Sequence, residues 1–174
     1  AKSIHTAESS LLDFNRAGVP LIEIVTEPDM NTKEEAMAYV EKLRELLLYA
    51  NISDCKIEEG SMRCDVNVSI SKTEKLGMRA EIKNIGSISN IGLAIQKEVE
   101  RQQEIYENGG TIQEETRRFD EKKGKTVLMR VKETGNDYRY FPEPDIPYVV
   151  LTEEEIESVK RMIPILPNVR RDFY

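Results

Sequence analysis

The sequence has few of the residues that build histidine-based catalytic triads, structural zinc sites and membrane spans. Its 174 residues include no tryptophan, a single histidine, His5, and two cysteines, Cys55 and Cys64. One histidine at the N-terminus does not support a catalytic triad within this chain, and two separated cysteines without nearby histidines do not indicate a zinc site. No apolar run approaches the roughly 18 residues of a membrane span, and no signal-peptide pattern opens the chain.

The sequence also has fewer basic than acidic residues. The chain has 25 Lys and Arg residues against 32 Asp and Glu residues, a formal net charge of −7. A general nucleic-acid binder draws its affinity from cationic side chains that neutralise phosphates, so this class is disfavoured, although a local basic patch or a basic partner protein is not excluded. The glycine-rich motifs GxGxxG and GxxxxGK[ST] are both absent, which argues against Rossmann and P-loop nucleotide sites.

What is present is typical of a globular domain, with 39% hydrophobic and 33% charged residues. Apolar spacing of three and four predicts long helices over about 33–50 and 88–108, and a capping box predicts a shorter one over about 152–161. A further helix is expected to begin at 168, after Pro164 and Pro167. Residues 1–10 are interpreted as a loop. Strands are predicted over 19–28, 53–58, 63–70, 78–83, 111–119, 126–132 and 148–151, with Val127, Met129 and Val131 on the core face of the strand over 126–132.

The short polar connections predict that 63–70 pairs with 78–83, and 111–119 with 126–132, as antiparallel hairpins. No βαβ run is evident. The pattern therefore predicts an α+β domain with a mostly antiparallel sheet and helices packed on one face, which leaves the other face open to ligands.

Two of these predicted strands alternate strictly between polar and apolar residues. Arg63, Asp65 and Asn67 occupy odd positions of the first, and Glu81 and Lys83 occupy odd positions of the second. A period of two places these side chains on one sheet face. Carboxylates, an amide and fixed cations together are suited to a magnesium–phosphate site, whereas the alternative is a solvated face with cross-strand salt bridges.

Other short motifs leave a functional and a structural interpretation open. Arg16 is either an anion clamp or a solvated arginine beside an Asx turn, and Glu59 is either a second carboxylate near Asp65 or part of an acidic turn. Arg117 and Arg118 are either an RNA contact or a solvated hairpin face. The aromatic run at 138–141 is either a stacking surface for a base or a plug over the sheet edge.

Taken together, several strings are more specific than any one alone. They are DFNRAGVPLIEIVTEPD at 13–29, EEGSMRCDVN at 58–67, AEIKN at 80–84, ETRRFD at 115–120 and YRYFPEPD at 138–145. In their order and spacing they resemble the B subunit of aspartyl/glutamyl-tRNA amidotransferases, and the resemblance covers essentially the whole chain.

The resemblance implies a partial glutamine-synthetase-like cradle, an antiparallel sheet whose concave face holds Mg²⁺ and ATP. It implies an ATP-dependent ligase that phosphorylates Glu or Asp misacylated on tRNA and then amidates it with ammonia to give Gln-tRNA(Gln) or Asn-tRNA(Asn). The implied partners are the amidase of the complex (its A subunit), a small C subunit and misacylated tRNA, with no membrane. We expect a cytoplasmic location. The alternative is a non-catalytic RNA- or protein-binding scaffold fragment of the same fold.

On this resemblance, residues 1–174 are expected to be a fragment of the catalytic cradle domain. The fragment would lack N-terminal strands and C-terminal helical and tail domains, and is expected to be inactive alone. Roles are then expected for three groups of residues. These are the metal ligands Glu81, Asp65 and Glu59, supported by Glu23 and Glu27; the catalytic phosphate or acyl-phosphate contacts Arg63, Lys83 and Arg16; and the ATP or tRNA-end contacts Tyr138, Arg139 and Glu143.

Overall fold

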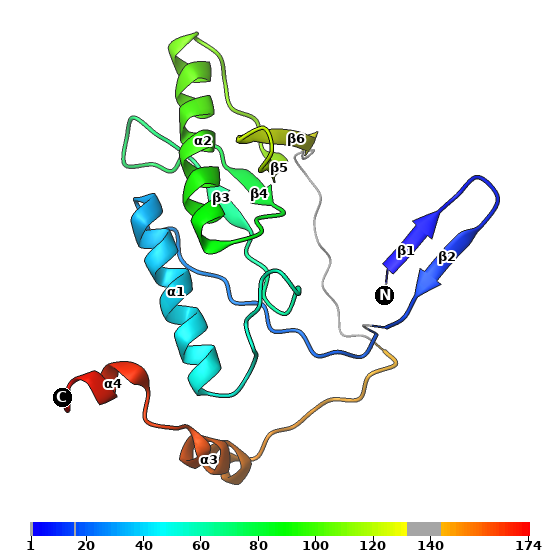
Figure 1. The fold of residues 1–174 in the computed structure, drawn as a ribbon, viewed down its shortest axis with the longest axis vertical. Helices are drawn as coiled ribbons and strands as arrows, with labels where there is room; N and C mark the ends of the chain where they lie inside the picture. Colours follow the sequence, from blue (N-terminus) through cyan, green and yellow to red (C-terminus); the bar gives the residue numbers. More distant parts are fainter. Residues whose placement is uncertain (1, 16, 132–143) are drawn as a thin grey trace.

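A computed structural model of the chain describes residues 2–15, 17–131 and 144–174 (Figure 1). Two sheets and four helices make up this part of the chain. In chain order the elements are β1 (Lys2–His5), β2 (Ser10–Asp13), α1 (Lys33–Tyr49), β3 (Val66–Val68), β4 (Ala80–Lys83), α2 (Ile88–Glu107), β5 (Glu115–Asp120), β6 (Lys125–Val131), α3 (Glu153–Met162) and α4 (Pro167–Arg171).

The four-stranded sheet has the order β3-β4-β5-β6. β3 runs antiparallel to β4 and β5 antiparallel to β6, so both predicted hairpins are confirmed. β4 and β5 are parallel, and α2 connects them. The prediction that the chain has no βαβ run is therefore wrong. Parallel neighbours need a crossover connection of a dozen or more residues, and the 20-residue α2 supplies it.

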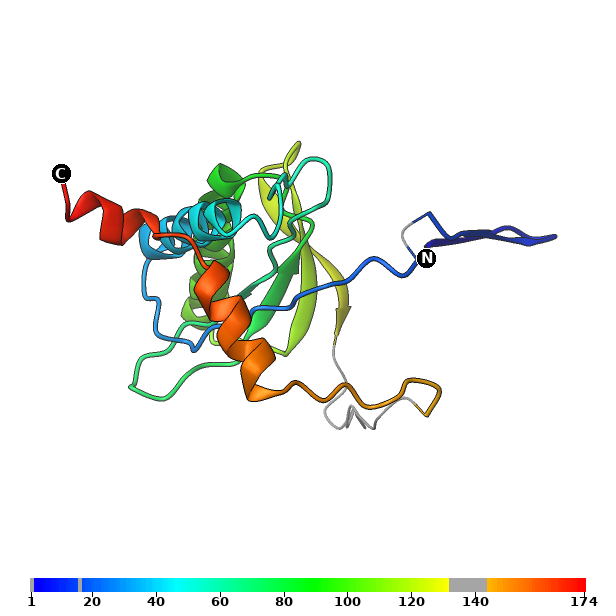
Figure 2. The same cartoon turned by 90° about the horizontal axis from the view of Figure 1, so that it is seen from below.

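Helices α1 and α2 cover one face of this sheet (Figure 2). Both begin where the sequence predicts. Thr32 accepts from the backbone N–H of Glu35 in a capping box, and Ser87 accepts from the N–H of Asn90. The helices and strands share one hydrophobic core. Its buried members are Val40 of α1, Val68 of β3, Ile82 of β4, Ile85 just before α2, Ile91 and Ala94 within α2, and Phe119 of β5. The predicted α+β class with helices on one face is confirmed.

The inward face of β6 differs from the prediction. Thr126 is buried and Val127 half-buried, whereas Met129 and Val131 are exposed. Thr126 pairs with the buried Phe119, and Val127 pairs with the exposed Arg118. Directly paired residues lie on the same face of a sheet, so this register turns Thr126 toward the helices and Val127 away from them. The period-two pattern of one strand does not reveal which of its faces points inward.

Three predicted strands are not formed. Residues 19–28, 53–58 and 148–151 have no strand structure, and the apolar side chains of 19–25 and 148–151 are exposed. A strand is stabilised by backbone pairing with a neighbour, and no described segment pairs with these residues. Residues 1–10, predicted as a loop, instead contribute β1 and the start of β2, which pair antiparallel in a hairpin apart from the main sheet (Figure 1).

The C-terminal part of the described chain is helical, as predicted. α3 begins with the predicted capping box of Thr152 and Glu155. α4 starts at Pro167, and Arg171 pairs with Glu45 of α1 at 2.5 Å. Across the described residues, no helix is long and apolar enough to cross a membrane.

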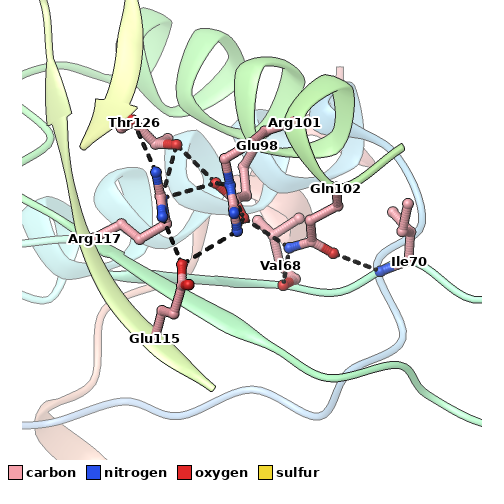
Figure 3. Close-up of polar contacts among 8 residues, drawn as sticks. All are labelled: Val68, Ile70, Glu98, Arg101, Gln102, Glu115, Arg117 and Thr126. Atoms are coloured by element: carbon pink, nitrogen blue, oxygen red, sulfur yellow. Dashed lines mark hydrogen bonds and ion pairs between the residues drawn. The ribbon is translucent and has the colours of Figure 1, made fainter. Parts of the chain in front are cut away.

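A polar network lies between α2 and the sheet (Figure 3). Glu98 and Gln102 of α2 are both 0% exposed. Gln102 donates to Glu98 Oε1 at 2.8 Å and to the carbonyl of Val68 at 3.1 Å, and it accepts from the N–H of Ile70 at 3.1 Å. One side chain thus ties α2 to β3 and to the residues that follow it.

The carboxylate of Glu98 is surrounded by donors from three elements. Arg101 of α2 contacts it at 2.6 Å, Thr126 of β6 donates to it at 2.8 Å, and Arg117 of β5 lies 3.4 Å away. Arg117 also pairs with Glu115 at 2.5 Å and donates to the Thr126 carbonyl at 3.1 Å. Arg117 is therefore neither an RNA contact nor a solvated residue, which corrects both interpretations of that position.

We predict that Glu98→Ala lowers the free energy of unfolding by about 3–5 kcal/mol, because it removes the fully buried carboxylate that Arg117, Arg101 and Thr126 contact and leaves the buried Arg117 with one carboxylate partner fewer. Urea denaturation followed by circular dichroism measures this change. The control is Glu100→Ala on the same helix, where an exposed carboxylate pairs with Lys97, and no measurable change is expected there. Equal midpoints for Glu98→Ala and the parent chain would contradict the prediction.

Candidate functional site

The sheet face opposite α1 and α2 carries the polar residues of the alternating strands. Met62, Cys64 and Val66 pack against the core cluster. Asp65, between Cys64 and Val66, lies on the other side, where it contacts Lys83 of β4 next to Glu81. We call this surface the polar face, and define it by Asp65, Asn67, Glu81, Lys83, Thr116 and Arg118. The alternation predicted from the sequence is confirmed.

Lys83 lies at the centre of the polar face. Its Nζ atom is 3.0 Å from Oε1 of Glu81 and 3.1 Å from Oδ2 of Asp65, so two carboxylates converge on one ammonium. The hydrogen bond to Glu81 raises the pKa of Lys83 above its ordinary value, and the contact with Asp65 adds to this. Lys83 therefore keeps its charge through neutral and moderately alkaline pH.

Glu81 has contacts on both neighbouring strands. It pairs in register with Asn67 of β3 on one side and with Thr116 of β5 on the other. The Thr116 hydroxyl donates to Oε2 of Glu81 at 3.3 Å. Arg118, which pairs in register with Lys83, is exposed and lies 3.7 Å from Asp120. The polar face thus combines carboxylates, an amide, a hydroxyl and cations.

Cys64 lies on the opposite side of the chain from Asp65. Burial raises the pKa of the Cys64 thiol to about 11, and the charge of Asp65 adds to the shift. The thiol is therefore protonated and unreactive near neutral pH. Cys64 packs against the core and takes no part in the polar face.

Other predicted site residues lie apart from this cluster. Glu59 is exposed and its carboxylate pairs with Lys56 at 2.9 Å, within a local turn. Arg63 is exposed and makes no ion pair within the described ranges. Glu23 and Glu27 lie in an exposed segment without regular structure. The remaining predicted residues, Arg16, Tyr138, Arg139 and Glu143, fall outside the described residues.

The donor chemistry of the polar face fits a divalent cation in part. Mg²⁺ in nucleotide sites is commonly held by one or two carboxylates, with water and phosphate oxygens completing its octahedron. Asp65 and Glu81 offer such a pair, because both already converge on a cation, the Lys83 ammonium. Among residues 2–15, 17–131 and 144–174, no group of three Asp, Glu, His or Cys side chains is placed to bind an ion by itself.

Comparison with known proteins identifies the family. Residues 1–157 match the GatB/GatE catalytic domain. The chain belongs to this family. It is 52% identical to the B subunit of the aspartyl/glutamyl-tRNA(Asn/Gln) amidotransferase from Bacillus cereus strains B4264 and G9842, and 51% identical to that from Bacillus thuringiensis strain Al Hakam. Each alignment covers 99% of this chain and 37% of the relative, so the chain spans just over a third of these GatB proteins.

Sequence reasoning missed two features of this GatB domain. Thr116 stands beside the paired arginines, and only the parallel β4–β5 register brings it to Glu81. Glu98 and Gln102 were missed although a signal exists, because they continue the stripe of Ile91 and Ala94 at helical spacing. A charged residue on an apolar stripe is a sign of a buried polar network.

We predict that Cys64 reacts with iodoacetamide at pH 8 at least about 100-fold more slowly in the folded chain than in the urea-unfolded chain. A pKa of about 11 leaves the thiol almost wholly protonated at this pH, whereas an ordinary thiol with a pKa of about 8.5 is partly ionised. Mass spectrometry of the Cys64 peptide measures the rate from pH 7 to 11.

The raised pKa of Cys64 also makes the stability of the fold depend on pH. Because the thiol has a higher pKa in the folded chain than in the unfolded chain, its protonated form contributes to the free energy of unfolding, and this contribution is complete below about pH 8.5. It is lost as the pH rises toward about 11. An alkylation midpoint near that of a free thiol would contradict the burial of Cys64.

Proposed function

We propose that this chain is a catalytic piece of the B subunit of a tRNA-dependent amidotransferase, and that the polar face is part of its carboxylate-activating site. Two findings support the proposal. The relatives that match almost the whole chain carry this name. In addition, Asp65 and Glu81 converge on Lys83 on the sheet face that the helices leave uncovered. The convergence of these three charges carries the assignment of the site.

The proposed reaction is an ATP-dependent amide synthesis, which makes the enzyme a ligase. The side-chain carboxylate of Glu or Asp misacylated on tRNA attacks the γ-phosphorus of ATP, and ADP leaves. Ammonia then attacks the acyl phosphate, inorganic phosphate leaves and the amide of Gln-tRNA(Gln) or Asn-tRNA(Asn) remains. Phosphorylation is needed because a free carboxylate is a poor acyl donor.

The residues of the polar face are suited to the charges of this reaction. Lys83 supplies a cation at a fixed position, and a preorganised cation stabilises the charge that develops during phosphoryl transfer. Asp65 and Glu81 present oxygens toward that cation and would hold Mg²⁺ together with the nucleotide. When bound, Mg²⁺ would neutralise charge on the β- and γ-phosphates.

The further expectations belong to the same proposal. Arg63 and Arg16 would contact phosphate or acyl phosphate, and Glu59 would add a carboxylate after a change in its loop. Tyr138, Arg139 and Glu143 would line the ATP or tRNA-end pocket. The partners would be the amidase that supplies ammonia, a small third protein of the complex and misacylated tRNA, in the cytoplasm. Residues 1–174 would be inactive alone, as a fragment of the catalytic cradle domain.

We predict that Glu81→Gln in the full-length protein, assembled in its complex, lowers tRNA-dependent ATP hydrolysis and amidated-tRNA formation by about 100-fold or more, because the charge at the site is lost. Asp65→Asn is expected to act in the same direction. The measurements are phosphate release and acid-gel analysis of the tRNA product.

Glutaminase activity of the complex and the surface variant Glu100→Gln serve as controls, and both are expected to stay near the parent level. Near-normal turnover in Glu81→Gln would instead mean that the Lys83 ion pairs are structural. That outcome would favour the scaffold alternative for this face of the chain.

A further inference from the structure

We propose that Thr116 is a positioning residue that fixes the orientation of the Glu81 carboxylate. The inference rests on the proposed function, because it assigns Glu81 to the activating site. It concerns a residue outside the expected site and a contact that forms only in the folded sheet. Its basis is the hydrogen bond from the Thr116 hydroxyl to Glu81.

A glutamate carboxylate has weak rotational preference about its last torsion, so its orientation depends on what its two oxygens contact. In Glu81 the two oxygens have different partners. Oε1 lies 3.0 Å from Lys83 Nζ, and Oε2 accepts from Thr116 Oγ1 at 3.3 Å. One contact alone would allow the carboxylate plane to rotate about it, whereas two contacts on different oxygens define the plane.

Thr116 is suited to hold this position. It is 2% exposed, so bulk water does not readily replace its hydroxyl. Its β-branched side chain is restricted at χ1. It pairs with Glu81 in the parallel β4–β5 register, which brings the donor and the acceptor onto the same face of neighbouring strands.

The backbone on either side of Thr116 is anchored from the opposite face of the sheet. Glu115 pairs with Arg117 at 2.5 Å and with Arg101 of α2 at 3.4 Å. Arg117 in turn forms an ion pair with Glu98 at 3.4 Å. The close-up of the network draws this contact as a dashed line (Figure 3). Glu115 and Arg117 of β5 therefore contact α2 on one side of the sheet, while Thr116 between them contacts Glu81 on the other side. A supporting contact of this kind, made from a rigid element, gives a site its precision.

The test compares Thr116→Val and Thr116→Ser in the full-length protein within its complex. Valine keeps the branched shape without the hydroxyl, and serine keeps the hydroxyl. We expect Thr116→Val to weaken binding of Mn²⁺, the probe for the cation site, about 10- to 100-fold, the range typical of residues that orient metal ligands. Electron paramagnetic resonance measures Mn²⁺ binding directly. Thr116→Ser keeps the hydroxyl, so its Mn²⁺ binding and kcat are expected to stay within about 3-fold of the parent values, well short of the loss expected for Thr116→Val.

Thr126→Val is the matched structural control. Thr126 is a second buried threonine whose hydroxyl donates to a glutamate, Glu98, at 2.8 Å, but on the helix side of the sheet. This variant is expected to lower the melting temperature while Mn²⁺ binding and kcat stay near the parent values. Thr116→Ala repeats the hydroxyl deletion with a smaller side chain, in case valine prevents assembly.

Three outcomes would overturn the inference. They are parent-level Mn²⁺ binding in both hydroxyl-deleted variants of Thr116, an equal loss in Thr126→Val, and no recovery in Thr116→Ser. Glu81→Gln, measured alongside, separates this inference from the proposed function. If Glu81→Gln retains full activity, the proposed site itself fails. If it is inactive while Thr116→Val behaves as the parent, only the positioning role fails.

Discussion

A buried carboxylate loses its hydrogen bonds to water, so the protein must supply donors in their place. Glu98 is such a carboxylate, and its donors come from both the helix and the sheet. It is fully buried, and its donors come from α2, β5 and β6. Breaking such a cluster costs more than its net contribution to stability, because the partners stay buried. The network therefore restricts α2 to one position over the sheet. Apolar contacts alone, being non-directional, would define that position less sharply.

The same strand that completes this network also completes the polar face. In β5, Glu115 and Arg117 face α2, while Thr116 faces Glu81. A one-residue slip of β5 would bring charged residues to the wrong side in both places. The buried network and the polar face therefore depend on a single strand register. The ion pairs of Lys83 are half-exposed and would be weak determinants of structure by themselves.

Local patterns predicted the parts of the fold and of the site that local physics controls. Capping boxes specify two helix starts by hydrogen bonds within four residues, and a hairpin brings Asp65 to Lys83 as predicted. Thr116 was missed because the β4–β5 pairing depends on contacts across the 20-residue α2, which no local pattern reports. Apolar composition misled at 19–28, because a strand needs a partner edge as well as β-forming residues. Glu59 was grouped with Asp65 by nearness in sequence, yet its turn closes locally.

The parallel β4–α2–β5 connection also bears on how the domain folds. The β3–β4 and β5–β6 hairpins close short loops, whereas β4 can meet β5 only after the chain has passed through α2 and returned. Contacts between distant residues form later, because their loop-closure entropy must be overcome first. The two hairpins are thus expected to form early and to dock through α2 in a later step. Because the Glu81–Thr116 contact joins one hairpin to the other, it can exist only after that docking, and the polar face is completed last.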